Sequence, residues 1–158
     1  MRLLVLSLFA LLLLSPVSSA KPLAANGISR NEMVSYLKAK GLPATREADD
    51  NKLQIVKSTV DGVNFDVYFF ECEPGDDGHC KQIQLAAGWS LSATLDADKT
   101  NIWNREHRFM RAYTTPGNTA LYGELDMVLA PNGSTGLIDA NFDLWKLLLA
   151  KFRKHFDI

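Results

Sequence analysis

Hydrophobic residues recur along this chain with two different spacings, which divide it into helices and strands. A spacing of three or four residues places apolar side chains on one side of a helix, whereas strict alternation places them on one face of a strand. The longest helical stripe consists of Ile138, Phe142, Trp145, Leu149, Phe152 and Phe156. It predicts a C-terminal helix over about 138–156 whose apolar side packs against the rest of the protein.

Two shorter helices are indicated by their end signals. Ser29 and Glu32 have the spacing of a capping box, in which each side chain accepts a hydrogen bond from the backbone N–H of the other residue. Gly41 suits the left-handed position that follows a helix, so the first helix is expected to end there. Asp96 is placed to cap a second short helix over about 97–106.

Alternating hydrophobic residues between these helices predict five strands. The expected strands are about 52–57, 63–69, 81–87, 108–115 and 119–129. Asp61-Gly62 suits a tight hairpin turn between the first two. The resulting order α-β-β-β-α-β-β-α predicts an α+β fold, an antiparallel sheet with packed helices.

Residues 1–20 have the three parts of a secretory signal peptide. Arg2 provides a positive start, Leu3 to Leu14 is apolar apart from one serine, and Ser18-Ser19-Ala20 is a cleavage site of small residues. The apolar run is shorter than the ~20 residues that a membrane-spanning helix needs. We therefore expect an exported protein, periplasmic or secreted, that is cleaved after Ala20 and has no stable membrane insertion.

The domain organisation that follows is simple. The 158 residues correspond to about one domain. Residues 1–20 are the expected signal peptide, 21–27 a flexible N-terminus and 28–158 one folded domain. Seventeen Lys and Arg residues oppose 18 Asp and Glu residues, for a net charge of −1. Because this balance offers no basic surface for phosphate backbones, we expect no nucleic-acid binding.

Cys72 and Cys80 are expected to form a disulfide, because an even pair of cysteines in an exported protein is normally oxidised. A zinc site is the alternative, since the acidic turn 73–77 and His79 lie between the two thiols. Their spacing does not match the usual zinc motifs, however. A redox-active pair is a third alternative, which the lack of C-x-x-C spacing disfavours. We therefore expect no metal and no cofactor.

His107 is the residue best suited to acid–base catalysis, because it lies next to Glu106 and histidine titrates near neutral pH. The sequence has no G-x-S-x-G, H-E-x-x-H or Walker motif that would supply a nucleophile, a metal or a phosphate site. We therefore assign no catalytic residue and expect that the protein is not an enzyme. A small enzyme that uses His107 remains an alternative.

The segment 101–113 is the richest in residues that mediate recognition. Its aromatic residues Trp103, Phe109 and Tyr113 are expected in the core. The charged residues between them are the candidate partner-binding residues, because arginine is frequent in protein interfaces. These candidates are Arg105, Glu106 and Arg111.

Three parts of the chain resemble the YbjN family of bacterial sensory transduction regulators. They are residues 80–89 (CKQIQLAAGW), residues 103–113 (WNREHRFMRAY) and the closing amphipathic helix with Trp145. Together they cover about residues 28–156. The resemblance implies a fold like that of type III secretion chaperones, and it carries over no catalytic residues. Unlike the better-known members, this chain has an export signal.

The expected function is therefore that of an exported, non-catalytic binding or chaperone-like protein of the YbjN family, with a regulatory effect. The resemblance implies an unidentified protein partner and a homodimer. A periplasmic protein that binds a small molecule or a metal through the acidic turn 73–77 is the alternative, and an enzyme that uses His107 is a further one.

Overall fold

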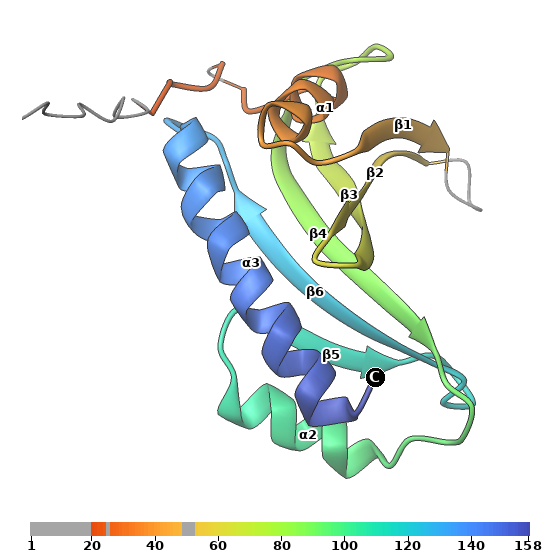
Figure 1. Ribbon diagram of the computed structural model, residues 1–158. Coiled ribbons are helices and arrows are strands. Elements are labelled where there is room, and N and C mark those ends of the chain that lie inside the picture. Colours follow the sequence, from red (N-terminus) through yellow and green to blue (C-terminus); the bar gives the residue numbers. More distant parts are fainter. Residues whose placement is uncertain (1–19, 25, 49–52) are drawn as a thin grey trace, which may run out of the picture.

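The computed structural model describes residues 20–24, 26–48 and 53–158. This part of the chain contains three helices and six strands (Figure 1). The six strands form one antiparallel sheet with the order β1-β2-β3-β4-β6-β5. The elements are α1 (Arg30–Ala39), β1 (Ala44–Ala48), β2 (Gln54–Val60), β3 (Val63–Cys72), β4 (Cys80–Ser90), α2 (Ala97–Glu106), β5 (Met110–Thr114), β6 (Ala120–Val128) and α3 (Thr135–Phe156). The expected signal peptide lies outside the described residues, apart from Ala20.

The structure confirms the α+β class and the predicted order of the elements, and it adds one strand. This strand, β1, pairs with β2 at the edge of the sheet, from Ala44 opposite Ser58 to Ala48 opposite Gln54. Its sequence ATREA contains a single buried residue, Ala44. Without alternating hydrophobic residues, β1 has no signal in the sequence, and its backbone pairing with β2 defines it.

One hydrophobic core lies between the sheet and the helices. Trp103, Trp145 and Phe152 are completely buried in it. The strand residues in this core come from one face of the sheet, which α3 crosses along its length (Figure 1). We call the other face the open face, because no helix of the described chain contributes a buried residue to it.

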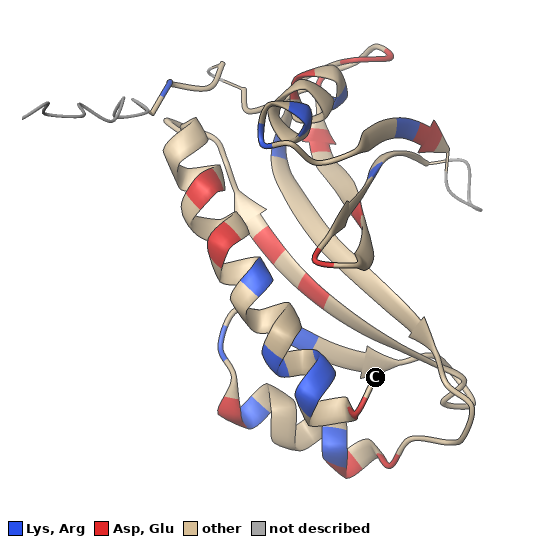
Figure 2. Cartoon of the chain, viewed as in Figure 1, with Lys and Arg blue, Asp and Glu red and all other residues tan. Residues whose placement is uncertain are grey.

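The helix ends follow the predicted signals. Ser29 and Glu32 form the capping box of α1, and Gly41 has a φ of +78° just after that helix. Asp96 caps α2. Along α3, acidic residues lie in the first half and basic residues in the second (Figure 2), which complements the helix dipole.

The sequence predicts flexibility for the segment 21–27, but several of its described residues pair with other parts of the chain. The Lys21 N–H donates to Thr135 Oγ1 at 2.9 Å, and its carbonyl accepts from the Thr135 N–H at 2.8 Å. Gly27 lies so close to Cys80 that a Cβ would come within 1.9 Å of the Cys80 carbonyl oxygen. Backbone pairing with the loop before α3 therefore holds a segment that has no hydrophobic pattern of its own.

No helix within the described residues is long and apolar enough to cross a membrane.

Candidate functional site

The sheet divides into two ribbons where β3 and β4 separate. The two strands pair from Cys72 opposite Cys80 to Asp66 opposite Ala86. Beyond this point β3 continues as a hairpin with β2, while β4 continues along β6 as far as Ser90. We call the space between the ribbons the fork.

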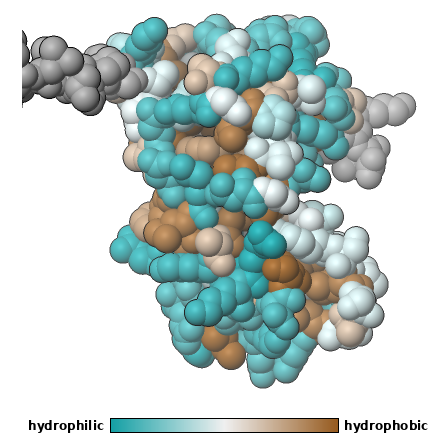
Figure 3. Space-filling model, in the orientation of Figure 1, coloured by the Kyte–Doolittle hydropathy of each residue, from teal (hydrophilic) through white to brown (hydrophobic). Residues whose placement is uncertain are grey.

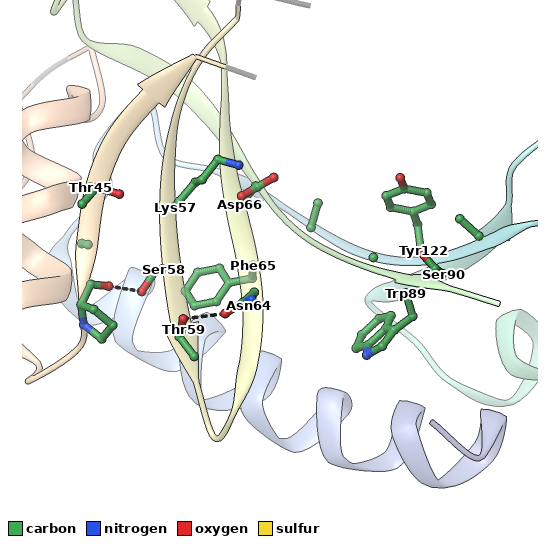
Figure 4. Close-up of a pocket in the computed structure, with 15 residues that line it drawn as sticks. Thr45, Lys57, Ser58, Thr59, Asn64, Phe65, Asp66, Trp89, Ser90 and Tyr122 are labelled. Atoms are coloured by element: carbon green, nitrogen blue, oxygen red, sulfur yellow. Dashed lines mark hydrogen bonds between the residues drawn. The ribbon is translucent and has the colours of Figure 1, made fainter. Parts of the chain in front are cut away.

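A groove of about 540 Å³ lies at the fork (Figure 4). Residues of both ribbons line it. Lys57, Asp66 and Tyr122 stand on the open face, whereas Trp89 points toward α3. The space-filling view shows hydrophobic side chains at the surface at mid-height of the molecule, over the middle of α3 (Figure 3).

A hydrogen-bonded cluster continues the site across the open face. Glu124 on β6 is only 6% exposed, and it accepts a hydrogen bond from Arg111 Nε at 2.6 Å. Its second oxygen accepts from the Tyr113 hydroxyl at 2.6 Å. Tyr113 stacks on Tyr122, with 5.3 Å between the ring centroids.

The electrostatic interactions in this cluster stabilise the charged form of Arg111 and the neutral form of Tyr113. The hydrogen bond to Glu124 raises the pKa of the Arg111 guanidinium. Burial, together with the hydrogen bond to the same carboxylate, raises the pKa of the Tyr113 phenol. Arginine therefore stays charged and tyrosine stays neutral across the physiological range, which suits recognition by hydrogen bonding and ring contacts better than proton transfer.

The three candidate partner-binding residues lie in two places. Arg105 and Glu106 are exposed at the end of α2, 3.6 Å apart, on the face that the helices cover. Arg111 lies on the open face, because it alternates along β5 with the buried Met110 and Ala112. The structure therefore does not combine these residues into one surface.

Two aromatic residues that were expected in the core are partly exposed, and these expectations are wrong. Phe109 is 62% exposed, because the chain turns there with a φ of +74° between α2 and β5. Tyr113 is 39% exposed, because it shares the open face with Arg111. Trp103 is buried as expected.

Trp103 and Asn104 close the outer edge of β5. Trp103 Nε1 donates to the Met110 carbonyl at 2.9 Å. The Asn104 amide donates to the Ala112 carbonyl at 2.9 Å and accepts from the Ala112 N–H at 2.7 Å. Backbone groups that would otherwise be available to another strand are thus occupied by two side chains of the segment 103–113.

His107 packs against aromatic rings. It stacks on Trp103 with 3.8 Å between the centroids, and His155 lies 6.3 Å away. Its buried Nδ1 has no hydrogen-bond partner among the described residues. Glu106, the expected neighbour for acid–base work, pairs instead with Arg105. This arrangement offers stacking rather than a base held against a nucleophile.

The acidic turn 73–77 is engaged in interactions with α1 and β1. Arg46 pairs with Asp76 at 2.6 Å and with Asp77 at 3.7 Å. Asp77 also accepts hydrogen bonds from Ser29 Oγ at 3.0 Å and the Asn31 N–H at 3.1 Å. Although burial raises the pKa of Asp77, these hydrogen bonds and the Arg46 charge lower it overall. The turn therefore reinforces the start of α1.

Metal ligation gains no support from this geometry. Cys72 and Cys80 are joined by a disulfide, so neither provides a thiolate. The described residues contain no group of three or more His, Cys, Asp or Glu side chains arranged to hold a metal ion. The metal alternative for the acidic turn thus lacks a ligand set in this part of the chain.

The groove residues Gly88, Trp89 and Tyr122 were not identified from the sequence as site residues. The feature of the sequence that could have pointed to them is Gly88, because a glycine inside a strand often marks a close approach by another group. At Gly88 this group is Tyr122, whose ring would come within 2.6 Å of an added Cβ.

A family model supports the resemblance of the sequence. The model described as "YbjN: Putative bacterial sensory transduction regulator" matches residues 29–157. This range contains every helix and strand of the described fold. No curated protein and no solved structure matches the chain.

Proposed function

Because the chain belongs to the YbjN family, we propose that it is an exported, non-catalytic regulatory protein that binds a protein partner through the open face of its sheet. The family description supports a regulatory role. The export signal and the disulfide support action in the periplasm or outside the cell. The homodimer implied by the resemblance to type III secretion chaperones makes a second copy of the chain one candidate partner.

The observation that carries this proposal is the character of the open face. Phe70, Tyr113 and Val128 all lie on this face, and they are 44%, 39% and 66% exposed. Arg111 and Tyr122 add a guanidinium and a second phenol ring beside Tyr113. Exposed aromatic and arginine side chains are the usual anchors of protein interfaces.

Export is tested by the mass of the mature protein. We expect that mass spectrometry of protein purified from the exported fraction detects a chain that begins at Lys21. An exported protein that retains Met1 would contradict the assignment of residues 1–20.

Binding through the open face is tested by photo-crosslinking in cells that export the protein. Benzoylphenylalanine is introduced at Val128 on the open face and, as a matched control, at Leu147 on α3. The two side chains are similarly exposed, at 66% and 54%. We expect a discrete crosslinked adduct from position 128 and none from position 147. An adduct from position 147 alone would place the binding surface on α3.

A further inference from the structure

The backbone groups of β4 point alternately toward β6 and toward β3. The Leu91 N–H donates to the Thr119 carbonyl at 2.9 Å, and the Leu129 N–H donates to the Lys81 carbonyl at 2.8 Å. Positions 81 and 91 therefore face β6. Because the direction alternates along an antiparallel strand, the even-numbered residues of β4 from Gln82 onward point to the side of β3.

Two of these even-numbered residues, Gly88 and Ser90, lie beyond the end of the pairing between β3 and β4. The pairing of β3 with β4 ends at Asp66 opposite Ala86. From Gly88 to Ser90, the backbone N–H and C=O groups that point into the fork are not paired with any strand within the described residues. Four strong hydrogen-bonding groups therefore line one wall of the groove, which makes this edge a template for another strand.

The two outer edges of the sheet are less suited to this role. Trp103 and Asn104 occupy the outer edge of β5 with their hydrogen bonds. The other outer strand, β1, has five residues and carries the charged side chains of Arg46 and Glu47, which disfavour pairing with another chain. The edge of β4 at the fork has neither protection.

From this geometry we propose that the fork binds an extended polypeptide segment, which adds to β4 as an antiparallel strand at Gly88 and Ser90. The inference rests on the proposed binding function and names the ligand class and the site. The free edge from 87 to 90 accommodates about four residues of a strand, or roughly 13 Å.

The side chains around this edge determine which segments fit. The Tyr122 ring lies against Gly88 on the open face. On the other side of β4, Trp89 is stacked on Phe152 with 5.3 Å between the centroids and is only partly buried. Alternate side chains of an added strand would thus meet Tyr122 and Trp89, so the segment carries apolar residues at both kinds of position.

The charges at the groove do not favour an acidic or a basic segment. Lys57 and Asp66 are opposite each other in the pairing of β2 with β3, and both line the groove. One charge of each sign at the same place leaves little net field. Binding is therefore expected to depend weakly on salt concentration.

Amide hydrogen exchange in the free protein tests the premise. NMR exchange rates are compared along β4, where Ala87 and Trp89 direct their N–H groups to β6 and Gly88 and Ser90 direct theirs into the fork. We expect fast exchange at 88 and 90 and slow exchange at 87 and 89. Equal protection at all four positions would overturn the proposal, because the edge would not be free.

Peptide binding tests the inference itself. The probe is an acetylated, amidated seven-residue peptide with lysine at both ends and alternating valine and phenylalanine between them, which puts apolar side chains on both faces of the strand. Its control is the same peptide with N-methylated central amides, which keeps the side chains and removes the strand donors. We expect the unmodified probe to protect the amides of Gly88 and Ser90, and the N-methylated peptide not to do so.

Two serine variants distinguish binding of the probe at the edge of β4 from binding at the surrounding surface. Ser90→Pro removes an N–H that faces the fork, and Ser92→Pro makes the same change in the loop after β4. Losing one hydrogen bond is expected to weaken binding of the probe about fivefold in Ser90→Pro, with little change in Ser92→Pro.

The outcomes distinguish this inference from the proposed function. Protection of amides elsewhere on the open face would overturn the fork as the binding site and leave the proposed function standing. Failure of the probe to bind would overturn the inference alone, because the crosslinking at Val128 reports the natural partner independently. Absence of both signals would contradict both proposals.

Discussion

Trp145→Ala is expected to lower the free energy of unfolding by about 3–5 kcal/mol, as large-to-small substitutions of buried aromatic residues do. Trp145 lies near the middle of α3 and is completely buried. Its ring contacts Phe65 on β3 edge to face, with 6.1 Å between the centroids. The substitution would leave a cavity between the helix and the sheet, and urea denaturation followed by circular dichroism measures the loss.

Two tryptophan-to-phenylalanine variants are the controls for this prediction. Trp145 Nε1 has no hydrogen-bond partner among the described residues, so Trp145→Phe removes volume and no hydrogen bond. Trp103→Phe also removes the hydrogen bond to the Met110 carbonyl, which is itself buried. We therefore expect Trp103→Phe to be the more destabilising of the two, by about 1 kcal/mol. Full stability in Trp145→Ala would mean that α3 does not pack on the sheet.

The helices could be predicted from the sequence because their signals are local. The capping box of Ser29 and Glu32, the cap at Asp96 and the apolar stripe of α3 each depend on residues a few positions apart. The hairpin of β2 and β3 is also local, because Asp61-Gly62 sets its register. These elements account for the correct order of the fold.

The open face and the fork depend on contacts between distant segments, which no local pattern contains. The fork exists because the pairing of β3 with β4 ends at Asp66 opposite Ala86. Where this pairing ends depends on how the two strands align, not on either strand alone. Arg111 looks like a free surface residue in the sequence, yet its partner is the buried Glu124 on the next strand. The alternation of Met110, Arg111, Ala112 and Tyr113 is the one signal that could have placed Arg111 and Tyr113 on the same face.

The disulfide was predicted because an even pair of cysteines is normally oxidised in an exported protein, and in the structure it links two neighbouring strands. Cys72 and Cys80 are directly opposite each other at one end of the pairing between β3 and β4, and the fork opens at the other end. Cys80 is completely buried, and its backbone also pairs with Ile28. The cross-link therefore joins the ends of β3 and β4, and the backbone of Cys80 holds the residue just before the N-cap of α1.

Loss of the disulfide is expected to lower the free energy of unfolding by about 2.5 kcal/mol, the value that chain entropy gives for so short a loop. Cys72→Ser, Cys80→Ser and the double variant each lose the same single cross-link, so we expect similar midpoints in urea for all three. The double variant should be no less stable than either single one, because no second bond is left to break. Treating the unmodified protein with a reductant should shift its midpoint to the same value. Free thiols in protein taken from the exported fraction would contradict both the pairing and the oxidising compartment that it implies.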